Sequence, residues 1–194
     1  MIKAIIFDCF GVIVGHGFDY TYESAGGDPN KDREFINEKL DQINKGIISN
    51  KEFSSAMVEN LGISKDQWIK ILRQSEKADS KLLNFIFKLR SKYKTAILSN
   101  ANIGVIDDLV GTEVINACFD EVVVSAEVGL IKPDIQIYEL VARKLGVKPN
   151  ECVYIDDRKR FVEVGGTLGM QTILYKNFKL FKQELNQILA SDSK

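Results

Sequence analysis

The chain has 194 residues, of which 45% are hydrophobic and 27% are charged, and its formal net charge at pH 7 is −1. This composition indicates a globular protein of one domain, or one domain with an insertion, and a net charge so near zero offers little attraction for nucleic acid or an anionic membrane. The three cysteines lie far apart and predict no disulfide framework, and no apolar run is long enough to span a membrane, so we expect a cytoplasmic protein.

Short apolar runs predict the strands of a buried parallel sheet. The first run spans residues 2–7, and four more occur in the second half of the chain, at residues 95–98, 121–124, 152–155 and 171–174. Helix-like stretches alternate with them, at residues 103–110, 135–145, 161–168 and 178–190. Strands that alternate with helices form a parallel sheet covered on both faces, which predicts an α/β fold with a Rossmann-like core.

Residues between the first two predicted strands break this alternation, because the region contains no strand-like run. Helices are predicted there instead, at residues 32–45, 51–61, 65–75 and 81–92. A helical insert after the first strand lies over the carboxyl edge of the sheet, where ligands of such sheets bind. We therefore expect a core formed by residues 1–15 and 93–194 and a cap formed by residues 16–92, with the last helix, about 80–92, free to pack on the core.

Polar side chains follow the predicted strands at points that should meet at this edge. They are Asp8, Ser99, Asn100, Lys132, Asp156 and Asp157. Lys132 lies in SAEVGLIKPD, a predicted loop that follows the strand at residues 121–124. Each residue alone fits an ordinary turn or helix start, but their recurrence at successive strand ends indicates one functional site.

This set of side chains suits chemistry on a phosphate group. A carboxylate such as Asp8 can act as a covalent nucleophile, and a divalent cation offsets its repulsion from the phosphate. Asp8, Asp156 and Asp157 provide the oxygen ligands that Mg²⁺ prefers. Lys132 can hold a phosphate oxygen, and the Ser99 hydroxyl with the amides after it, including that of Asn100, can donate hydrogen bonds to another.

Four segments together resemble the motifs of the haloacid dehalogenase-like hydrolase superfamily, in the branch with a small helical cap inserted after the first motif. FDCFGVIV is similar to the first motif and ILSNAN to the second. GLIKPDIQIYELVARKLGVKPNECVYIDDR is similar to the third and fourth, and KGIISNKEF is similar to a segment common in such caps. The resemblance covers nearly the whole chain.

The resemblance implies a hydrolase that forms an aspartyl phosphate on Asp8 and then cleaves it with water. It implies a Mg²⁺ ion held by Asp8, by the backbone carbonyl of Phe10 and by the acidic pair, with Asp157 as a direct ligand and Asp156 bound directly or through water. The expected substrate is a small phosphate ester selected by the cap, and Lys132 and Ser99 take the catalytic and phosphate-binding roles already described.

Two positions depart from the family pattern. Phe10 stands where family phosphatases usually carry a second aspartate that protonates the leaving oxygen, and such acid–base help is worth about 10²–10⁴-fold. Phe161 stands where an asparagine or aspartate often supports the metal site. We therefore expect slow turnover of alkyl phosphates, and His16, the single histidine, is a candidate substitute for the missing acid.

Two alternatives to a phosphatase remain at this stage. An aromatic residue at position 10 is also similar to the dehalogenases of the superfamily, although those do not need the acidic pair, and only Arg33 and Arg73 are candidates to receive a halide from the cap. A catalytically silent relative that binds a phosphorylated ligand or a protein is the other alternative. The apolar stripe of Phe178, Phe181, Leu185 and Ile188 is expected to pack on the sheet, in a monomer or a weak dimer.

Overall fold

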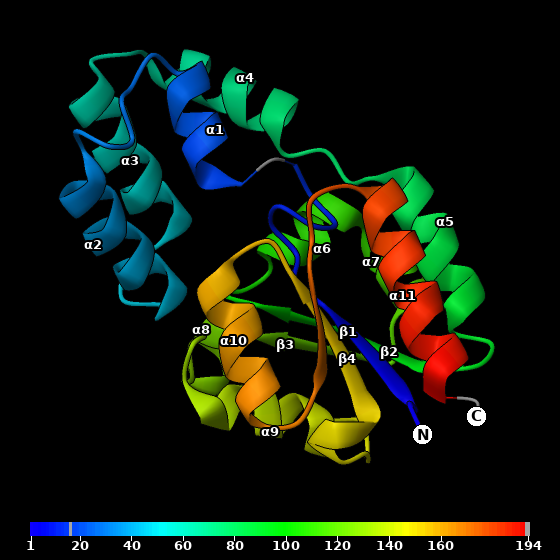
Figure 1. Ribbon diagram of the computed structural model, residues 1–194. Coiled ribbons are helices and arrows are strands. Elements are labelled where there is room, and N and C mark those ends of the chain that lie inside the picture. Colours follow the sequence, from blue (N-terminus) through cyan, green and yellow to red (C-terminus); the bar gives the residue numbers. More distant parts are fainter. Residues whose placement is uncertain (16, 193–194) are drawn as a thin grey trace.

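The computed structural model describes residues 1–15 and 17–192 and contains one parallel sheet of five strands in the order β3-β2-β1-β4-β5 (Figure 1). The strands are β1 (Ala4–Phe7), β2 (Lys94–Ser99), β3 (Glu121–Val124), β4 (Cys152–Asp156) and β5 (Gln171–Leu174). All paired strands run parallel, which confirms the predicted α/β fold. Because β1 is central, the residue that follows it, Asp8, lies in the middle of the carboxyl edge.

Helices cover both faces of this sheet. Alternate side chains of β1 enter two different clusters, with Ile5 and Phe7 in one and Ala4 and Ile6 in the other. The first cluster includes side chains of α5 (Ser80–Leu89), α6 (Val105–Val110), α7 (Thr112–Cys118) and α11 (Phe178–Asp192). The second includes α9 (Ile135–Lys144) and α10 (Lys159–Thr167), and a 3-10 turn at Pro149–Glu151 precedes β4.

Four helices form a separate group beyond the edge of the sheet (Figure 1). They are α1 (Phe18–Ser24), α2 (Arg33–Asn44), α3 (Asn50–Leu61) and α4 (Lys65–Ser75). Their apolar faces make a third cluster whose largest fully buried side chains are Trp68, Tyr22 and Ile36. We call α1–α4 the cap; α5, the last helix before β2, instead contributes Leu82 and Ile86 to the sheet cluster.

The chain crosses between the sheet and the cap twice, and the two crossings are hydrogen-bonded to each other. The amide of Gly15 donates to the carbonyl of Lys77 at 3.1 Å, and the amide of Asp79 donates to the carbonyl of Ile13 at 2.8 Å. Val14 and Ala78 form an isolated antiparallel bridge between them. The outgoing and returning segments therefore make a two-stranded hinge beside the carboxyl edge.

Three short helices depart from the sequence-based expectation. The helices α1 and α7 have seven residues each and α8 (Ser125–Val128) has four, which is too short for a hydrophobic repeat to mark them. The prediction that SAEVGLIKPD is a loop is therefore wrong at its start, where α8 ends on the left-handed Gly129.

The C-terminal stripe packs on the sheet. Phe181 and Leu185 of α11 are buried in the first cluster, and the ring of Phe181 meets that of Phe7 edge to face with centroids 5.9 Å apart. Within the described ranges, no helix combines the length and the apolar character needed to cross a bilayer.

Candidate active site

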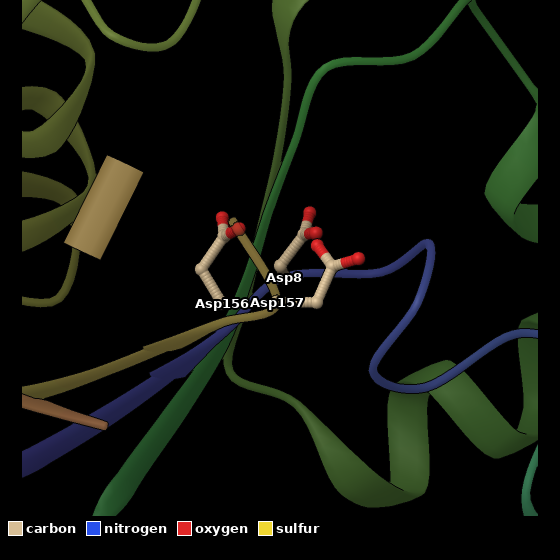
Figure 2. A group of neighbouring side chains, drawn as sticks. All are labelled: Asp8, Asp156 and Asp157. Atoms are coloured by element: carbon tan, nitrogen blue, oxygen red, sulfur yellow. The ribbon is translucent and has the colours of Figure 1, made fainter. Parts of the chain in front are cut away.

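Asp8 occupies the first position after the central strand. Its amide donates to the carbonyl of Ile155 in β4 at 2.8 Å, which extends the strand pairing by one residue and fixes the backbone. The side chain is buried at the edge where β4 ends in Asp156 and Asp157, and Figure 2 shows the three carboxylates gathered there.

Lys132 joins two of these carboxylates. Its Nζ donates to Asp8 Oδ1 at 2.8 Å and to Asp156 Oδ2 at 2.7 Å, and the side chain is 1% exposed. Burial lowers the pKa of Lys132, but the two carboxylates outweigh burial and raise it overall, so the side chain stays charged. A buried cation between two anions is the arrangement that makes burial of all three charges tolerable.

The side chain of Asn100 binds the backbone of Lys132. Its Nδ2 donates to the Lys132 carbonyl at 2.9 Å, and its Oδ1 accepts from the Lys132 amide at 2.8 Å. The two bonds link the segment after β2 to the lysine segment. The prediction that Asn100 binds phosphate therefore concerns its backbone amide, while its side chain positions Lys132.

Asp156 is fully engaged by protein groups. Its Oδ2 accepts from Lys132 and from the Tyr154 hydroxyl, and its Oδ1 accepts from the Arg158 amide at 2.8 Å. The side chain has no exposed surface. These contacts suit a residue that orients Lys132, and they leave Asp156 less free than its neighbour to bind a metal directly.

Asp157 presents the opposite case. Among the described residues, its Oδ1 is one of three buried side-chain polar atoms without a hydrogen-bond partner. Burial, followed by the charge of Asp156, raises the pKa of Asp157 to about 6, although Arg158 acts in the opposite direction. An unpartnered buried oxygen beside other carboxylates is what a cation site requires, because the ion would supply the missing partner.

The three carboxylates are close enough to share one ion. Ligand oxygens of Asp8, Asp156 and Asp157 all lie within 4.8 Å of one another. Burial raises the pKa of Asp8 to about 7, with Lys132 lowering it and the two other carboxylates raising it further. A divalent cation would stabilise the ionised form of all three, so the donor set fits Mg²⁺.

Ser99 ends β2 with a buried hydroxyl that has no hydrogen-bond partner within the described part of the chain. It does not line the cavity described below. The amide of Ala101, two residues after Ser99, donates to Ser125 Oγ at 3.0 Å. The Ser99 hydroxyl therefore lacks a partner but lies outside the cavity lining, whereas the amide of Ala101 is already bonded.

Phe161 lies beneath the lysine. It is buried in α10, and Lys132 Nζ lies 5.0 Å from the centre of its ring, within the range of a cation–π contact. The expected polar support for the metal site is thus replaced by an aromatic face that supports Lys132.

A cavity of about 540 Å³ opens above these residues, between the sheet edge and the cap. Asp8, Phe10, Lys132 and Asp157 line its floor. The cap contributes apolar side chains and several amides, among them Asn37, Asn44 and Asn50. A small phosphorylated molecule fits this volume, with its phosphate at the floor and its remainder under the cap.

The cap is tied down over this cavity by two polar contacts. Ser125 Oγ donates to the carbonyl of Asn44 at 2.6 Å, and Asn102 Nδ2 donates to Asn50 Oδ1 at 3.3 Å. The contacts join Ser125, the first residue of α8, to the end of α2 and Asn102, after β2, to the start of α3, so they hold the cap over the cavity.

The cavity also brings in residues that the sequence analysis did not select for it. Glu76, on the returning side of the hinge, and the pair Arg158 and Arg160 line it. Glu76 follows a helix without any motif, so no sequence signal marks it. Arg158 and Arg160 lie at the start of α10, directly after the acidic pair.

The remaining residues proposed from the sequence are Arg33, Arg73 and His16. Arg33 makes two bonds to Asp19, at 3.0 and 2.9 Å, and the described residues that line the cavity include neither Arg33 nor Arg73. His16 lies outside the described residues.

Comparisons with known proteins agree with this geometry. A family model described as haloacid dehalogenase-like hydrolase matches residues 2–162. The D-ribitol-5-phosphate phosphatase of Bacteroides thetaiotaomicron is 27% identical, over 98% of this chain and 100% of its own length. A HAD family enzyme of the same organism, in a crystal structure with magnesium and inorganic phosphate, superposes with a TM-score of 0.69 at 26% identity, covering 91% of this chain and 95% of that one. An L-2-haloacid dehalogenase shares the fold alone, with a TM-score of 0.63 at 18% identity over 89% of this chain and 83% of its own.

Proposed function

The chain belongs to the haloacid dehalogenase-like hydrolase family, and from this membership we propose that it is a magnesium-dependent phosphatase acting on a small phosphorylated metabolite through Asp8. The observation that carries the proposal is the convergence of Asp8, Asp157 and Lys132 on the floor of one cavity. A buried nucleophile, a buried cation and an unpartnered carboxylate oxygen at one point suit the transfer of a phosphoryl group.

The residues divide the reaction between them. Asp8 attacks phosphorus and the alcohol oxygen departs, and water then cleaves the aspartyl phosphate. Lys132 lowers the pKa of Asp8, which favours its ionised form, and faces the negative charge that develops on the phosphate oxygens. Asp156, Tyr154 and Asn100 hold Lys132 in place, and the Ser99 hydroxyl donates to a phosphate oxygen.

Asp8, Asp157 and the backbone carbonyl of Phe10 would hold the Mg²⁺ ion, and Asp156 would contribute through water because protein donors occupy both of its oxygens. The bound ion offsets the repulsion between the Asp8 carboxylate and the phosphate. The magnesium in the related enzyme supports this assignment.

The cavity favours a hydroxylated carbon chain as the alcohol part of the substrate. Asn37, Asn44, Asn50 and Asn102 line it with amides that both donate and accept hydrogen bonds, as hydroxyl groups require. The D-ribitol-5-phosphate phosphatase relative supports a polyol phosphate of this kind.

Dehalogenation is less well supported. The acidic pair has no task in that reaction, and the described cavity lining includes neither arginine proposed to receive a halide. A silent binding protein would carry the same residues as the phosphatase, so turnover must separate these two readings.

A panel of phosphorylated metabolites, assayed with Mg²⁺ and with a chelator, tests the proposal. We expect hydrolysis that requires Mg²⁺ and is abolished in Asp8→Ala, while Asp66→Asn, an exposed cap residue, serves as the matched control. Beryllium fluoride, a mimic of the aspartyl phosphate, should bind the wild type with Mg²⁺ and fail to bind Asp8→Ala. Hydrolysis that persists in Asp8→Ala, or no hydrolysis by the wild type, would contradict the proposal.

A further inference from the structure

We propose that Glu76, on the hinge segment that returns from the cap to the sheet, is the general acid and base that position 10 lacks. The assignment rests on the proposed phosphatase function and adds a catalytic residue to it. Glu76 belongs to none of the four family motifs and lies 66 residues beyond Phe10 in the sequence.

Glu76 shares the cavity with the reacting groups. Its side chain lines the same cavity as Asp8, Phe10 and Lys132. It immediately follows α4, whose last residue is Ser75, and it is half-buried. A carboxyl group that enters the cavity from the cap side faces the part of the substrate that departs from phosphorus, because Asp8 approaches phosphorus from the sheet side.

The hinge fixes Glu76 against the loop that carries Phe10. A Cβ atom on Gly15 would overlap the carbonyl oxygen of Ser75, so the two segments touch along their backbones. The Gly15 amide bonds to Lys77, on the other side of Glu76, at 3.1 Å. Phe10 and Val14 form a bridge within the same loop. The hinge therefore holds Glu76 beside the loop that carries Phe10. From there, the Glu76 side chain can take the role that a side chain at position 10 usually has.

Among the described residues, the carboxyl group of Glu76 makes no hydrogen bond or ion pair. Burial and the charge of Asp8 raise the pKa of the buried Cys9 thiol, and the charge of Glu76 raises it further. The other charged groups that line the cavity are Asp8, Asp41, Lys132, Asp157, Arg158 and Arg160. Burial raises the pKa of Glu76 to about 7, so the group can both give and accept a proton near neutral pH.

The proton transfers balance across the two steps. In the first step Asp8 forms a bond to phosphorus, the bond from phosphorus to the alcohol oxygen breaks, and the Glu76 proton passes to that oxygen. In the second step the Glu76 carboxylate takes a proton from water while the water oxygen bonds to phosphorus. The bond to Asp8 then breaks, inorganic phosphate leaves, and Glu76 is protonated again.

Steady-state turnover of Glu76→Gln on two substrates tests the assignment. An alkyl leaving group depends on the acid because it departs as a strong base, whereas the p-nitrophenyl group departs as a stable anion. Because kcat/KM covers only the steps up to departure of the alcohol, we expect kcat/KM for the best alkyl phosphate of the panel to fall by about 10²–10⁴-fold, with little change in kcat/KM for p-nitrophenyl phosphate. The kcat falls for both substrates where the shared hydrolysis of the aspartyl phosphate, which uses Glu76 as the base, limits turnover. Glu59→Gln, an exposed glutamate on α3, should change neither rate.

A rescue experiment separates an acid from a residue that merely supports the hinge. In Phe10→Asp/Glu76→Gln, an aspartate at position 10 should restore alkyl turnover that the single variant has lost. The wild type gives a second measure, which is the ratio of kcat/KM for the alkyl substrate to kcat/KM for the aryl substrate. Asp8 attacks both substrates, so the effect of its titration cancels in this ratio. That ratio should fall as the pH rises above about 7.

The results distinguish the assignment of Glu76 from the proposed phosphatase function. Loss of alkyl turnover in Glu76→Gln, together with rescue, supports the assignment. Unchanged kcat/KM for the alkyl substrate, an equal loss of kcat/KM on both substrates, or loss in His16→Ala alone would overturn it while leaving the phosphatase intact. No hydrolysis of p-nitrophenyl phosphate or any alkyl phosphate by the wild type would overturn both.

Discussion

At the level of single residues, Gly11 controls how closely Asp157 approaches the first loop. Gly11 has a φ of +83°, and a Cβ atom there would overlap the Asp157 carboxylate. Both the backbone conformation and the lack of a side chain are therefore needed at this position.

We expect Gly11→Ala to displace Asp157 and to lower Mg²⁺ affinity by about 10–100-fold, as the loss of a supporting contact at a metal site does. Titration calorimetry measures this affinity. Gly166→Ala in α10 is the control, because a Cβ atom there meets nothing within 4 Å. Equal Mg²⁺ affinity in Gly11→Ala and the wild type would remove Asp157 from the metal site.

Glu76 also gives a prediction for stability that does not depend on catalysis. Its pKa of about 7 in the folded protein lies above the ordinary value of 4.5, so its neutral form favours folding at low pH. This stability is present below pH 4.5 and is lost as the pH rises through 7. Glu76→Gln keeps a neutral side chain at every pH.

The free energy of unfolding of Glu76→Gln should therefore match that of the wild type near pH 4.5 and exceed it by on the order of 3 kcal/mol at pH 8. Urea denaturation without Mg²⁺ at both pH values measures the difference. A gain of the same size at both pH values would mean that packing, and not charge, is responsible.

At the level of elements, two cap helices begin with the same device but serve different parts of the molecule. Ser49 and Glu52 form a capping box at the start of α3, and Ser64 and Gln67 form one at the start of α4. Asn50, at the start of α3, lines the cavity and bonds to Asn102, whereas the cavity meets α4 only near its far end.

Ser49→Ala and Ser64→Ala should each lower the free energy of unfolding by about 1 kcal/mol. Only Ser49→Ala should also raise the KM for the substrate, because fraying at the start of α3 moves Asn50. Chemical denaturation and steady-state kinetics on the pair check both statements. An equal rise in KM for the two variants would show that cap stability in general, and not the start of α3, sets substrate affinity.

The sequence could predict the elements that have a repeating pattern. The strands at Glu121–Val124 and Gln171–Leu174 and the helix at Lys65–Ser75 have the bounds that their hydrophobic patterns indicate. Residues at strand ends, such as Asp8, could be placed together because parallel strands share one carboxyl edge. Glu76 could not, because its place in the cavity depends on backbone contacts across the hinge, and the bonds of Asn100 to Lys132 depend on how two loops pack.

At the level of the whole molecule, two contacts hold the cap over the cavity. Ser125 bonds to the end of α2 and Asn102 to the start of α3. Two such contacts are weak enough to open and close during turnover, since each net hydrogen bond is worth about 0.5–1.5 kcal/mol.

We expect Ser125→Ala to favour the open cap, which should speed amide hydrogen exchange at the end of α2 and raise KM several-fold. Exchange followed by mass spectrometry measures the first effect. Ser191→Ala, which removes a comparable bond within α11, is the control. Unchanged exchange in α2 would show that this contact does not hold the cap closed.

The hinge has a consequence for how such a protein can diversify. Because the chain leaves the sheet and returns to it at adjacent, hydrogen-bonded residues, an insert of any size can occupy the space between them without disturbing strand order or either apolar face of the sheet. Selection can then exchange the recognition module while the phosphate chemistry below it is inherited unchanged. Glu76, the proposed acid, lies at the boundary of the insert, so a new insert brings its own proton donor and changes which leaving groups the Asp8 nucleophile can expel.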